Sequence, residues 1–137
     1  MAVTLVRTVT ATDLQVLGYD RKFAADPTQL VLLRAQMAQA AGCHGVVCSG
    51  REVKRVKELC GPDFITVCPG IRPAWAMVPG DDQQRIVTPL AAIKNGADYI
   101  VVGRPIRRAP DPAAAAHEVV AEIAAGMKDI FGEGAKG

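Results

Sequence analysis

Four short, almost uninterrupted apolar runs recur along the chain, and each is followed by a segment with the marks of a helix. The runs cover residues 3–6, 46–48, 64–67 and 99–102 and are rich in β-branched side chains. Because they are continuously apolar rather than alternating, they predict strands that are covered on both faces, as in parallel sheets. The order strand–helix, repeated four times, places the chain in the α/β class.

The predicted helices have recognisable starts. A side chain that can cap a helix stands directly before a proline in the pairs Asp26-Pro27, Thr88-Pro89 and Asp111-Pro112. A fourth start is expected at residues 49–52, where Ser49 and Glu52 have the spacing of a capping box.

The helix that begins at Pro27 is predicted to end at Gly42. Its apolar spacing predicts a buried stripe made of Leu30, Leu33, Met37 and Ala41.

The composition is that of an ordinary globular protein. The chain has 137 residues, 50% of them hydrophobic, and 16 Lys and Arg against 14 Asp and Glu. This favours one globular domain, predicted over residues 1–131 with a frayed tail at 132–137, and argues against disorder and against a nucleic-acid partner. No apolar stretch approaches the ~20 residues of a membrane span and no secretory signal is recognisable, so a cytoplasmic protein that binds no membrane is expected.

The cysteines and histidines show no metal-binding pattern. Cys43, Cys48, Cys60 and Cys68 contain no C-x-x-C pair, and the two histidines lie far apart in the chain. Neither a metal nor a cofactor is therefore expected. Cys48 and Cys68 end apolar runs and are interpreted as small buried hydrophobic residues rather than reactive thiols.

Four βα units are compatible with two architectures: a small doubly wound sheet, or a (βα)4 half of a TIM barrel. In a half-barrel all helices cover one face of the sheet, which leaves the inner face open to water. Such a face is normally hidden by a partner, so the half-barrel reading predicts dimerisation.

Two polar segments follow predicted strands, where α/β folds place ligands. One contains Arg72 and continues to Gln83, and the other begins with Gly103 and Arg104. A glycine lets a backbone N–H approach a ligand closely, and guanidinium donors match phosphate oxygens. The residues favour anion binding, although surface ion pairs would explain the arginines equally simply.

Three strings make the resemblance to a family specific: P-G-I-R-P, W-x-x-x-P-G-D-D-Q-x-R-I-V-T-P and A-D-Y-I-V-V-G-R-P-I. In this order and spacing they resemble the C-terminal half of orotidine 5′-monophosphate decarboxylases, carboxy-lyases of pyrimidine nucleotide biosynthesis. The resemblance covers nearly the whole chain and implies a half-barrel with parallel strands.

The resemblance also implies roles for individual residues. The family's phosphate-binding arginine and the glycine before it match Arg104 and Gly103, its glutamine matches Gln83, and Arg72 matches an arginine beside the phosphate. The family implies a phosphorylated small molecule, such as a uridine or orotidine nucleotide, as ligand.

The pyrimidine pocket is matched less closely. Pro69 corresponds to a proline that lines it, and Thr8 stands where the family usually has a serine that hydrogen-bonds the base.

The family's catalytic array, a lysine and aspartates that include a D-x-K-x-x-D run, has no match in this chain. Residues 20–26 look similar, but their last spacing is one residue too long, and Asp26-Pro27 is better explained as a helix cap. Decarboxylation needs a lysine at the developing carbanion. The chain alone is therefore expected to bind phosphate without catalysing the reaction, and no catalytic residue is assigned.

Three functions remain open on the sequence. The first is a half-barrel that forms a homodimer and keeps a phosphate site. The second is a subunit or fragment of an active decarboxylase whose N-terminal half comes from another chain. The third is a structural or interaction module without catalysis.

Overall fold

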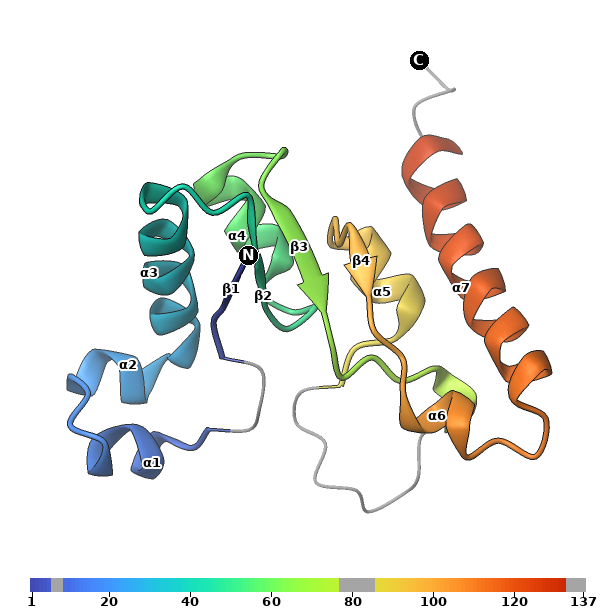
Figure 1. The fold of residues 1–137 in the computed structure, drawn as a ribbon, viewed down its shortest axis with the longest axis horizontal. Coiled ribbons are helices and arrows are strands. Elements are labelled where there is room, and N and C mark those ends of the chain that lie inside the picture. The colour runs from blue at the N-terminus through green and yellow to red at the C-terminus, as the bar shows by residue number, and fades with distance from the viewer. Residues whose placement is uncertain (6–8, 77–85, 133–137) are drawn as a thin grey trace.

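Four strands form one parallel sheet in chain order. The computed structural model describes residues 1–5, 9–76 and 86–132. Its strands are β1 (Ala2–Val3), β2 (Gly45–Val47), β3 (Ile65–Cys68) and β4 (Tyr99–Ile100), paired β1-β2-β3-β4. All four expected strands are confirmed, each with slightly different ends (Figure 1).

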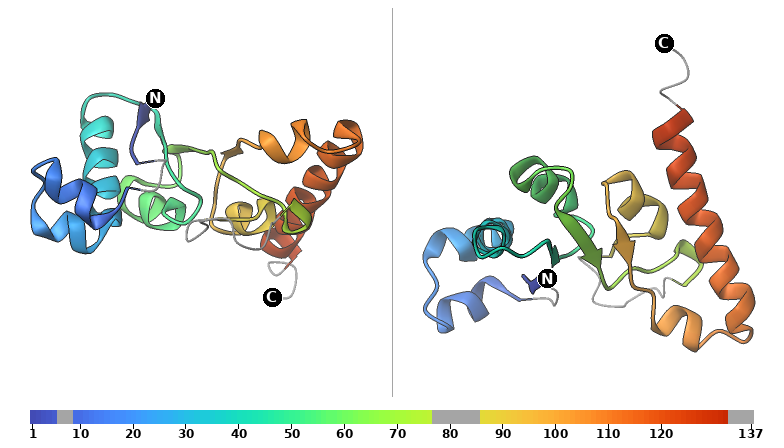
Figure 2. Two further views of the ribbon diagram at one scale, coloured as in Figure 1. Left: turned by 90° about the horizontal axis from the view of Figure 1, so that it is seen from below. Right: turned by 45° about the horizontal axis from the view of Figure 1, so that its top comes forward.

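Helices connect the strands and cover one face of the sheet. They are α1 (Ala11–Val16), α2 (Arg21–Ala25), α3 (Pro27–Ala40), α4 (Val53–Cys60), η1 (Ala74–Ala76), α5 (Pro89–Lys94), α6 (Arg104–Arg107) and α7 (Pro112–Gly132). Helices α4 and α5 lie behind the strands in Figure 1, and α3 lies beside β1 and β2; the view from below in Figure 2 (left) again places α4 and α5 on one side of the strands. This arrangement is the predicted half-barrel and not a doubly wound sheet.

The three predicted proline-preceded caps are present. The Asp26 carboxylate accepts the Thr28 N–H at 3.0 Å, and the Thr88 hydroxyl oxygen accepts the Ala91 N–H at 3.2 Å. The Asp111 carboxylate accepts two N–H groups at the start of α7. Each cap satisfies donors that the first helical turn leaves without a partner.

The predicted buried stripe of α3 is wrong beyond its first residue. Leu33 and Met37 are 40% and 63% exposed, and Ala41 is also exposed. The residues that face the core are Leu30, Val31, Ala35 and Ala38. The apolar residues of α3 are distributed around most of its circumference, so their spacing did not identify the buried face. The buried face includes two alanines, whose small side chains let the helix pack closely against the sheet.

The start of α4 also differs from the prediction. Ser49 does not cap a helix with Glu52; instead the Glu52 N–H donates to the Ser49 carbonyl oxygen at 3.0 Å in a turn. Helix α4 begins at Val53, directly after Glu52. The Glu52 side chain is buried and does not form the capping-box bond that was expected with residue 49. Helix α4 ends at Cys60, and Gly61 follows it with a φ of +94°.

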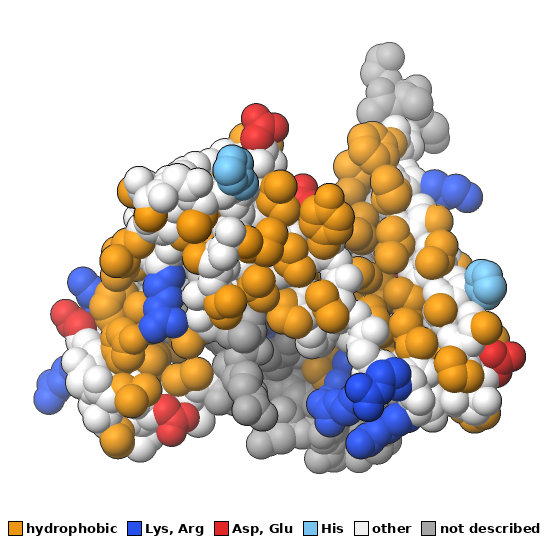
Figure 3. Space-filling view, viewed as in Figure 1, with side chains coloured by type: hydrophobic (Ala, Val, Ile, Leu, Met, Phe, Trp, Pro, Cys, Tyr) orange, Lys and Arg blue, Asp and Glu red, His pale blue; other side chains and the backbone are white. Residues whose placement is uncertain are grey.

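One row of apolar side chains crosses the uncovered face of the sheet. Strand register aligns Val3 with Val47, Val47 with Val67, and Val67 with Tyr99. Val3 and Tyr99, at the two edges, are 61% and 60% exposed, whereas Val46 on the helix-covered face is fully buried. Figure 3 shows hydrophobic side chains spread over this viewed face. We call the row Val3–Val47–Val67–Tyr99 the inner row.

Asp98 connects the end strand to the rest of the sheet. One carboxylate oxygen accepts the Thr66 N–H at 2.7 Å and the Thr66 hydroxyl at 3.0 Å, and the same oxygen meets the Lys57 ammonium at 2.7 Å. Partial burial opposes ionisation, but these bonds outweigh it and hold the pKa of Asp98 below its usual 3.8. The contact ties β4 to both β3 and α4.

None of the helices in the described part of the chain is long and apolar enough to cross a membrane. The predicted domain boundary stays a prediction. Helix α7 includes Gly132, the first residue of the expected tail, and residues 133–137 lie outside the described ranges.

Candidate functional site

A tight turn after β3 positions the first candidate arginine. Gly70 has a φ of +76°, a conformation that favours glycine, and it redirects the chain directly after Pro69. Ile71 then forms a parallel bridge with Val87, and the Arg72 N–H donates to the Val87 carbonyl oxygen at 3.1 Å. The backbone of Arg72 is thus fixed beside the start of α5, and its side chain is half-buried.

The second candidate segment begins directly after β4. Gly103 precedes α6, and its carbonyl oxygen accepts the N–H groups of Ile106 and Arg107 at 3.2 and 3.0 Å. A Cβ added at Gly103 would meet no atom within 4 Å, and its φ of −106° does not require glycine. Neither packing nor backbone strain within the described chain explains this glycine, whereas an open space beside its backbone leaves room for a ligand.

The two predicted arginines meet at one hollow. A hollow of about 380 Å³ is lined by Arg72, Trp75, Ala76, Arg104, Pro105, Arg108, Ala109 and Pro110. Arg72 comes from the segment after β3 and Arg104 from the segment after β4, so the carboxyl ends of neighbouring parallel strands bring them together, as α/β folds do at ligand sites. Gly103 lies next to Arg104 in the chain.

Other predicted site residues are placed differently. Pro69 is half-buried after β3 but does not line this hollow. Thr8 and Gln83 lie outside the described residues. The sequence reasoning assigned no role to Trp75 or Arg108, although Arg108 follows Arg104 by four residues, a spacing that places two side chains on one side of a helix.

The surface beside the hollow is basic. Figure 3 shows Lys and Arg side chains gathered near α6. Arg104, Arg107 and Arg108 belong to α6 and its C-cap, and within the described residues their guanidinium groups form no ion pair or hydrogen bond. Arg72 does take part in an interaction within the chain.

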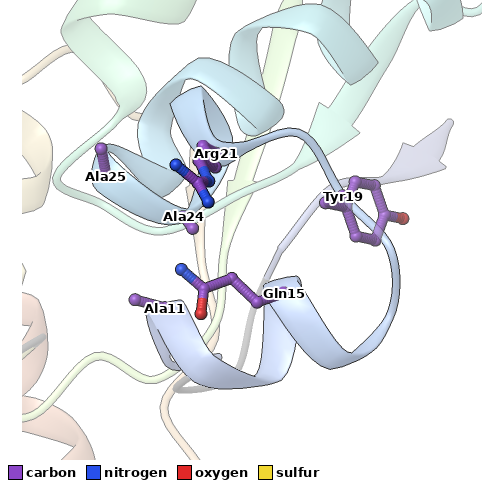
Figure 4. A pocket seen from close by; sticks show the side chains of 6 residues that line it. All are labelled: Ala11, Gln15, Tyr19, Arg21, Ala24 and Ala25. Carbon is purple, nitrogen blue, oxygen red and sulfur yellow. The ribbon is translucent and has the colours of Figure 1, made fainter.

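A larger hollow, of about 670 Å³, lies between α1 and α2. It is lined by Ala11, Gln15, Tyr19, Arg21, Ala24 and Ala25 (Figure 4). Arg21 is the one charged residue in this lining, and three of the six residues offer only methyl groups. Although it is larger, it gathers none of the predicted ligand residues, so charge and chemistry favour the hollow at Arg72 and Arg104.

The run that resembles a catalytic array serves as helix caps. Asp20 accepts the Lys22 N–H at 3.1 Å at the start of α2, and Asp26 caps α3. The Lys22 ammonium lies over the Phe23 ring, 4.9 Å from its centre. Burial, the largest single cause, raises the pKa of Asp26, but the hydrogen bonds from Gln29 and Thr28 and the charge of Arg55 together outweigh it and lower this pKa. Both aspartates therefore cap helices, as the sequence predicted for Asp26.

Cys48, directly after β2, and Cys68, the last residue of β3, are both completely buried, which confirms their interpretation as core residues. The hydrogen bond between the two side chains, and then burial, raise the pKa of the Cys48 thiol far above its ordinary value. A thiol of this kind is a poor nucleophile because the thiolate is the reactive form.

Comparison with known proteins gives a consistent picture. Residues 1–119 match the family model described as "Orotidine 5'-phosphate decarboxylase / HUMPS family". Curated relatives include the orotidine 5′-phosphate decarboxylases of Geotalea daltonii and Xanthomonas euvesicatoria. They are 47% and 49% identical over 92% and 93% of this chain, and each match covers 50% of the relative's length. The chain thus spans about half the length of the curated relatives it matches.

Solved structures show the same relation. The crystal structure of orotidine 5′-phosphate decarboxylase from Lactobacillus acidophilus superposes with a TM-score of 0.69 at 37% identity, covering 88% of this chain and 47% of that one. An uncharacterized conserved protein from Geobacillus kaustophilus superposes with a TM-score of 0.60 at 28% identity, covering 90% of this chain and 47% of its own.

Proposed function

Since this chain belongs to the orotidine 5′-phosphate decarboxylase / HUMPS family, we propose that its 137 residues form a half-barrel that binds the phosphate of a pyrimidine nucleotide. The observation that carries this proposal is the meeting of Arg72 and Arg104 at one hollow, beyond the ends of β3 and β4. Arg104 supplies guanidinium donors, and Gly103, at which an added Cβ would meet no atom within 4 Å, is proposed to donate its N–H to the phosphate. Gln83 is proposed as a further donor, and Pro69 and Thr8 as base contacts.

The test is titration with uridine 5′-monophosphate. A charge-assisted hydrogen bond contributes about 1.5–3 kcal/mol, so Arg104→Ala should weaken binding at least roughly tenfold. Arg21→Ala is a matched control, because Arg21 lines the other hollow and should leave the affinity unchanged. Equal affinities of the wild type and Arg104→Ala would overturn the assignment.

We also propose that a second copy of the chain covers the inner row. The sheet has two edges, β1 and β4, and all its pairs are parallel. A two-fold axis roughly parallel to the strands leaves strand direction unchanged. Strand β4 of each copy can therefore lie parallel to β1 of the other copy, which joins the two sheets at both of their edges. The product is a closed sheet of eight parallel strands, the number that forms a TIM barrel with a filled interior.

Sedimentation, with and without uridine 5′-monophosphate, tests this assembly. The expected mass is twice 14.4 kDa. A monomer that stays soluble at micromolar concentration would contradict the homodimer. Reducing conditions are appropriate, because all four cysteines are free thiols and we propose a cytoplasmic location.

We propose further that these residues alone do not decarboxylate orotidine 5′-monophosphate. In the described part of the chain every lysine lies on a helix: Lys22, Lys54, Lys57, Lys94 and Lys128. Lys57 is held by Asp98 and the Pro62 carbonyl oxygen, and Lys94 pairs with Asp129 at 3.1 Å. An ammonium fixed in these contacts cannot reach a carbanion on the inner side of the sheet.

A second candidate function is that of a subunit of an active lyase. It is supported by the match to only half of each relative, because another chain could then supply the other half. The discriminating assay measures decarboxylation by the purified chain alone and after addition of the N-terminal half of a full-length relative. We expect no turnover in the first case. Turnover that appears only in the mixture would support the subunit, and turnover by the chain alone would refute our account of its lysines.

A further inference from the structure

Helices at the two ends of the sheet carry large apolar side chains that stay exposed in the single chain. Helix α3 lies beside β1 and β2, and α7 lies beyond α5 at the opposite end, in Figure 1 as in Figure 2. On α3, Leu33 and Met37 are 40% and 63% exposed. On α7, Met127 and Phe131 are 47% and 71% exposed. Each edge of the sheet thus has an apolar helix surface beside it.

Each of these surfaces is a stripe along one side of its helix. Leu33 and Met37 are four residues apart, as are Met127 and Phe131, a spacing that places side chains on the same side of a helix. Val120, also exposed, precedes Met127 by about two turns on that side. We call Leu33 and Met37 the α3 stripe, and Val120, Met127 and Phe131 the α7 stripe. The α3 stripe is the part of the sequence-predicted stripe that the single chain leaves uncovered.

The α3 stripe faces away from the neighbouring helix α4. The Gln39 side chain donates to the Cys60 carbonyl oxygen, at the end of α4, at 2.6 Å. Met37 precedes Gln39 by two residues, and because each residue turns a helix by about 100°, it lies on nearly the opposite side of α3. The stripe is therefore directed outward at the β1 edge of the sheet.

The α7 stripe faces away from its neighbour, α5, in the same manner. The Asp129 carboxylate pairs with the Lys94 ammonium of α5 at 3.1 Å, and a Cβ at Gly126 would lie 3.1 Å from the Leu90 carbonyl oxygen. Met127 precedes Asp129 by two residues and so lies on nearly the opposite side of α7. This stripe is directed outward at the β4 end of the helix layer.

We propose that the α7 stripe packs on the α3 stripe of a second copy. The two stripes of one chain cannot meet, because they lie at opposite ends of the sheet (Figure 1). In the proposed eight-stranded arrangement, β4 of each copy neighbours the partner's β1, so α7 becomes the neighbour of the partner's α3. The stripes that face away from α5 and from α4 then face each other, and both are apolar. This inference rests on the proposed dimer and names the helices that seal its two junctions.

Sedimentation equilibrium of charged variants measures the contribution of this contact. Met37→Lys and Met127→Glu each place a charge against an apolar helix surface, which is unfavourable, and each should raise the dimer dissociation constant at least tenfold. Leu59→Glu is the matched control. Leu59 is 42% exposed on α4, which lies between α3 and α5 in Figure 1, so the dissociation constant should change no more than twofold. Circular dichroism establishes that each variant is folded.

Mixtures of variants test whether the two stripes touch, which a loss of stability in one chain would not imitate. An equimolar mixture of Met37→Lys and Met127→Glu brings an ammonium against a carboxylate at one junction and leaves the other junction unchanged. A mixture of Met37→Lys and Met127→Lys differs only in bringing two ammonium groups together. We expect the first mixture to form the mixed dimer at least fivefold more tightly, because opposite charges attract and like charges repel across an interface.

The outcomes separate this contact from the proposed dimer. If Tyr99→Asp dissociates the dimer but the Met37 and Met127 variants behave like Leu59→Glu, the inner row joins the copies and this inference is wrong. Equal dimerisation of the two mixtures would also overturn it, because the stripes then do not meet. A wild type that sediments as a single chain overturns both the dimer and the contact.

Discussion

Replacing Asp98 by alanine should destabilise the fold more than any other single change in the sheet's polar contacts. The side chain of Thr66 is completely buried, and its N–H depends on the Asp98 carboxylate at 2.7 Å. Leaving a buried N–H without an acceptor costs about 1–3 kcal/mol. The Lys57–Asp98 ion pair adds at most about 1 kcal/mol, because the aspartate side chain is 36% exposed and water screens the pair. The expected loss is therefore about 1–4 kcal/mol in the free energy of unfolding.

Urea denaturation followed by circular dichroism, at one fixed protein concentration, measures this loss. Lys57→Met is the matched control, since it removes the ion pair and the bond to the Pro62 carbonyl oxygen but leaves both bonds from Thr66 to the carboxylate. It should cost about 1 kcal/mol or less. A loss below about 0.5 kcal/mol for Asp98→Ala, or a larger loss for Lys57→Met, would refute the reasoning.

The same contact predicts a pH dependence. The folded-state pKa of Asp98 is lowered from 3.8, so the folded protein binds fewer protons than the unfolded chain in this range. Its stabilising contribution is complete above the unfolded pKa and disappears as the pH falls through the lower, folded pKa. The difference in unfolding free energy between the wild type and Asp98→Asn should therefore be constant near neutral pH and shrink below about pH 4.

Two further predictions concern glycines. A Cβ at Gly45 would collide with the Ile65 carbonyl oxygen, so Gly45→Ala should force β2 away from β3 and cost about 2–4 kcal/mol in urea denaturation. Gly103→Ala, in open space, should change the free energy of unfolding by no more than about 0.5 kcal/mol and weaken only phosphate binding. Gly126→Val should separate α7 from α5, because even a Cβ there lies 3.1 Å from the Leu90 carbonyl oxygen; we expect a loss of about 1–3 kcal/mol, and an unchanged unfolding midpoint would contradict this packing.

The fold could be predicted because its signals are local and redundant. A capping side chain before a proline marks a helix start with little dependence on tertiary structure, and all three such pairs open helices. Continuous apolar runs likewise identified the four strands, although only one face of their sheet is covered by helices and Val3 and Tyr99 on the other face are exposed. The resemblance to half of a barrel then selected one-sided covering over a doubly wound sheet.

Other features depend on contacts between distant residues. Which side of α3 faces the sheet is decided by packing, because its apolar residues do not form a single stripe. The short helix α1 was missed, although Thr10 and Asp13 form a reciprocal capping box that its S/T-x-x-D spacing could have indicated. Helix α6 has no side-chain cap, so Pro105 in its first turn is the local signal that could have indicated its start.

The candidate site likewise combines residues that local motifs identify with contacts that only the tertiary fold determines. Arg72 and Arg104 could be named from the family motifs, but their meeting at one hollow depends on β3 and β4 being neighbours in the sheet. Trp75 and Arg108 enter the lining because η1 and α6 approach each other, a contact between segments about thirty residues apart that no local pattern encodes.

The proposed second copy leads to a prediction about Tyr99. This residue ends the inner row on edge strand β4 and is 60% exposed in one chain. In the closed eight-stranded arrangement the row becomes interior, where an unpaired carboxylate is strongly unfavourable. Tyr99→Asp should therefore convert the dimer to a monomer in sedimentation at micromolar concentration, with the helices retained in circular dichroism. Leu59→Asp is the control, because Leu59 lies on α4, is 42% exposed, and stands apart from the inner row, so its dimer should persist. Equal masses for the two variants would mean that the inner row is not the surface through which the copies associate.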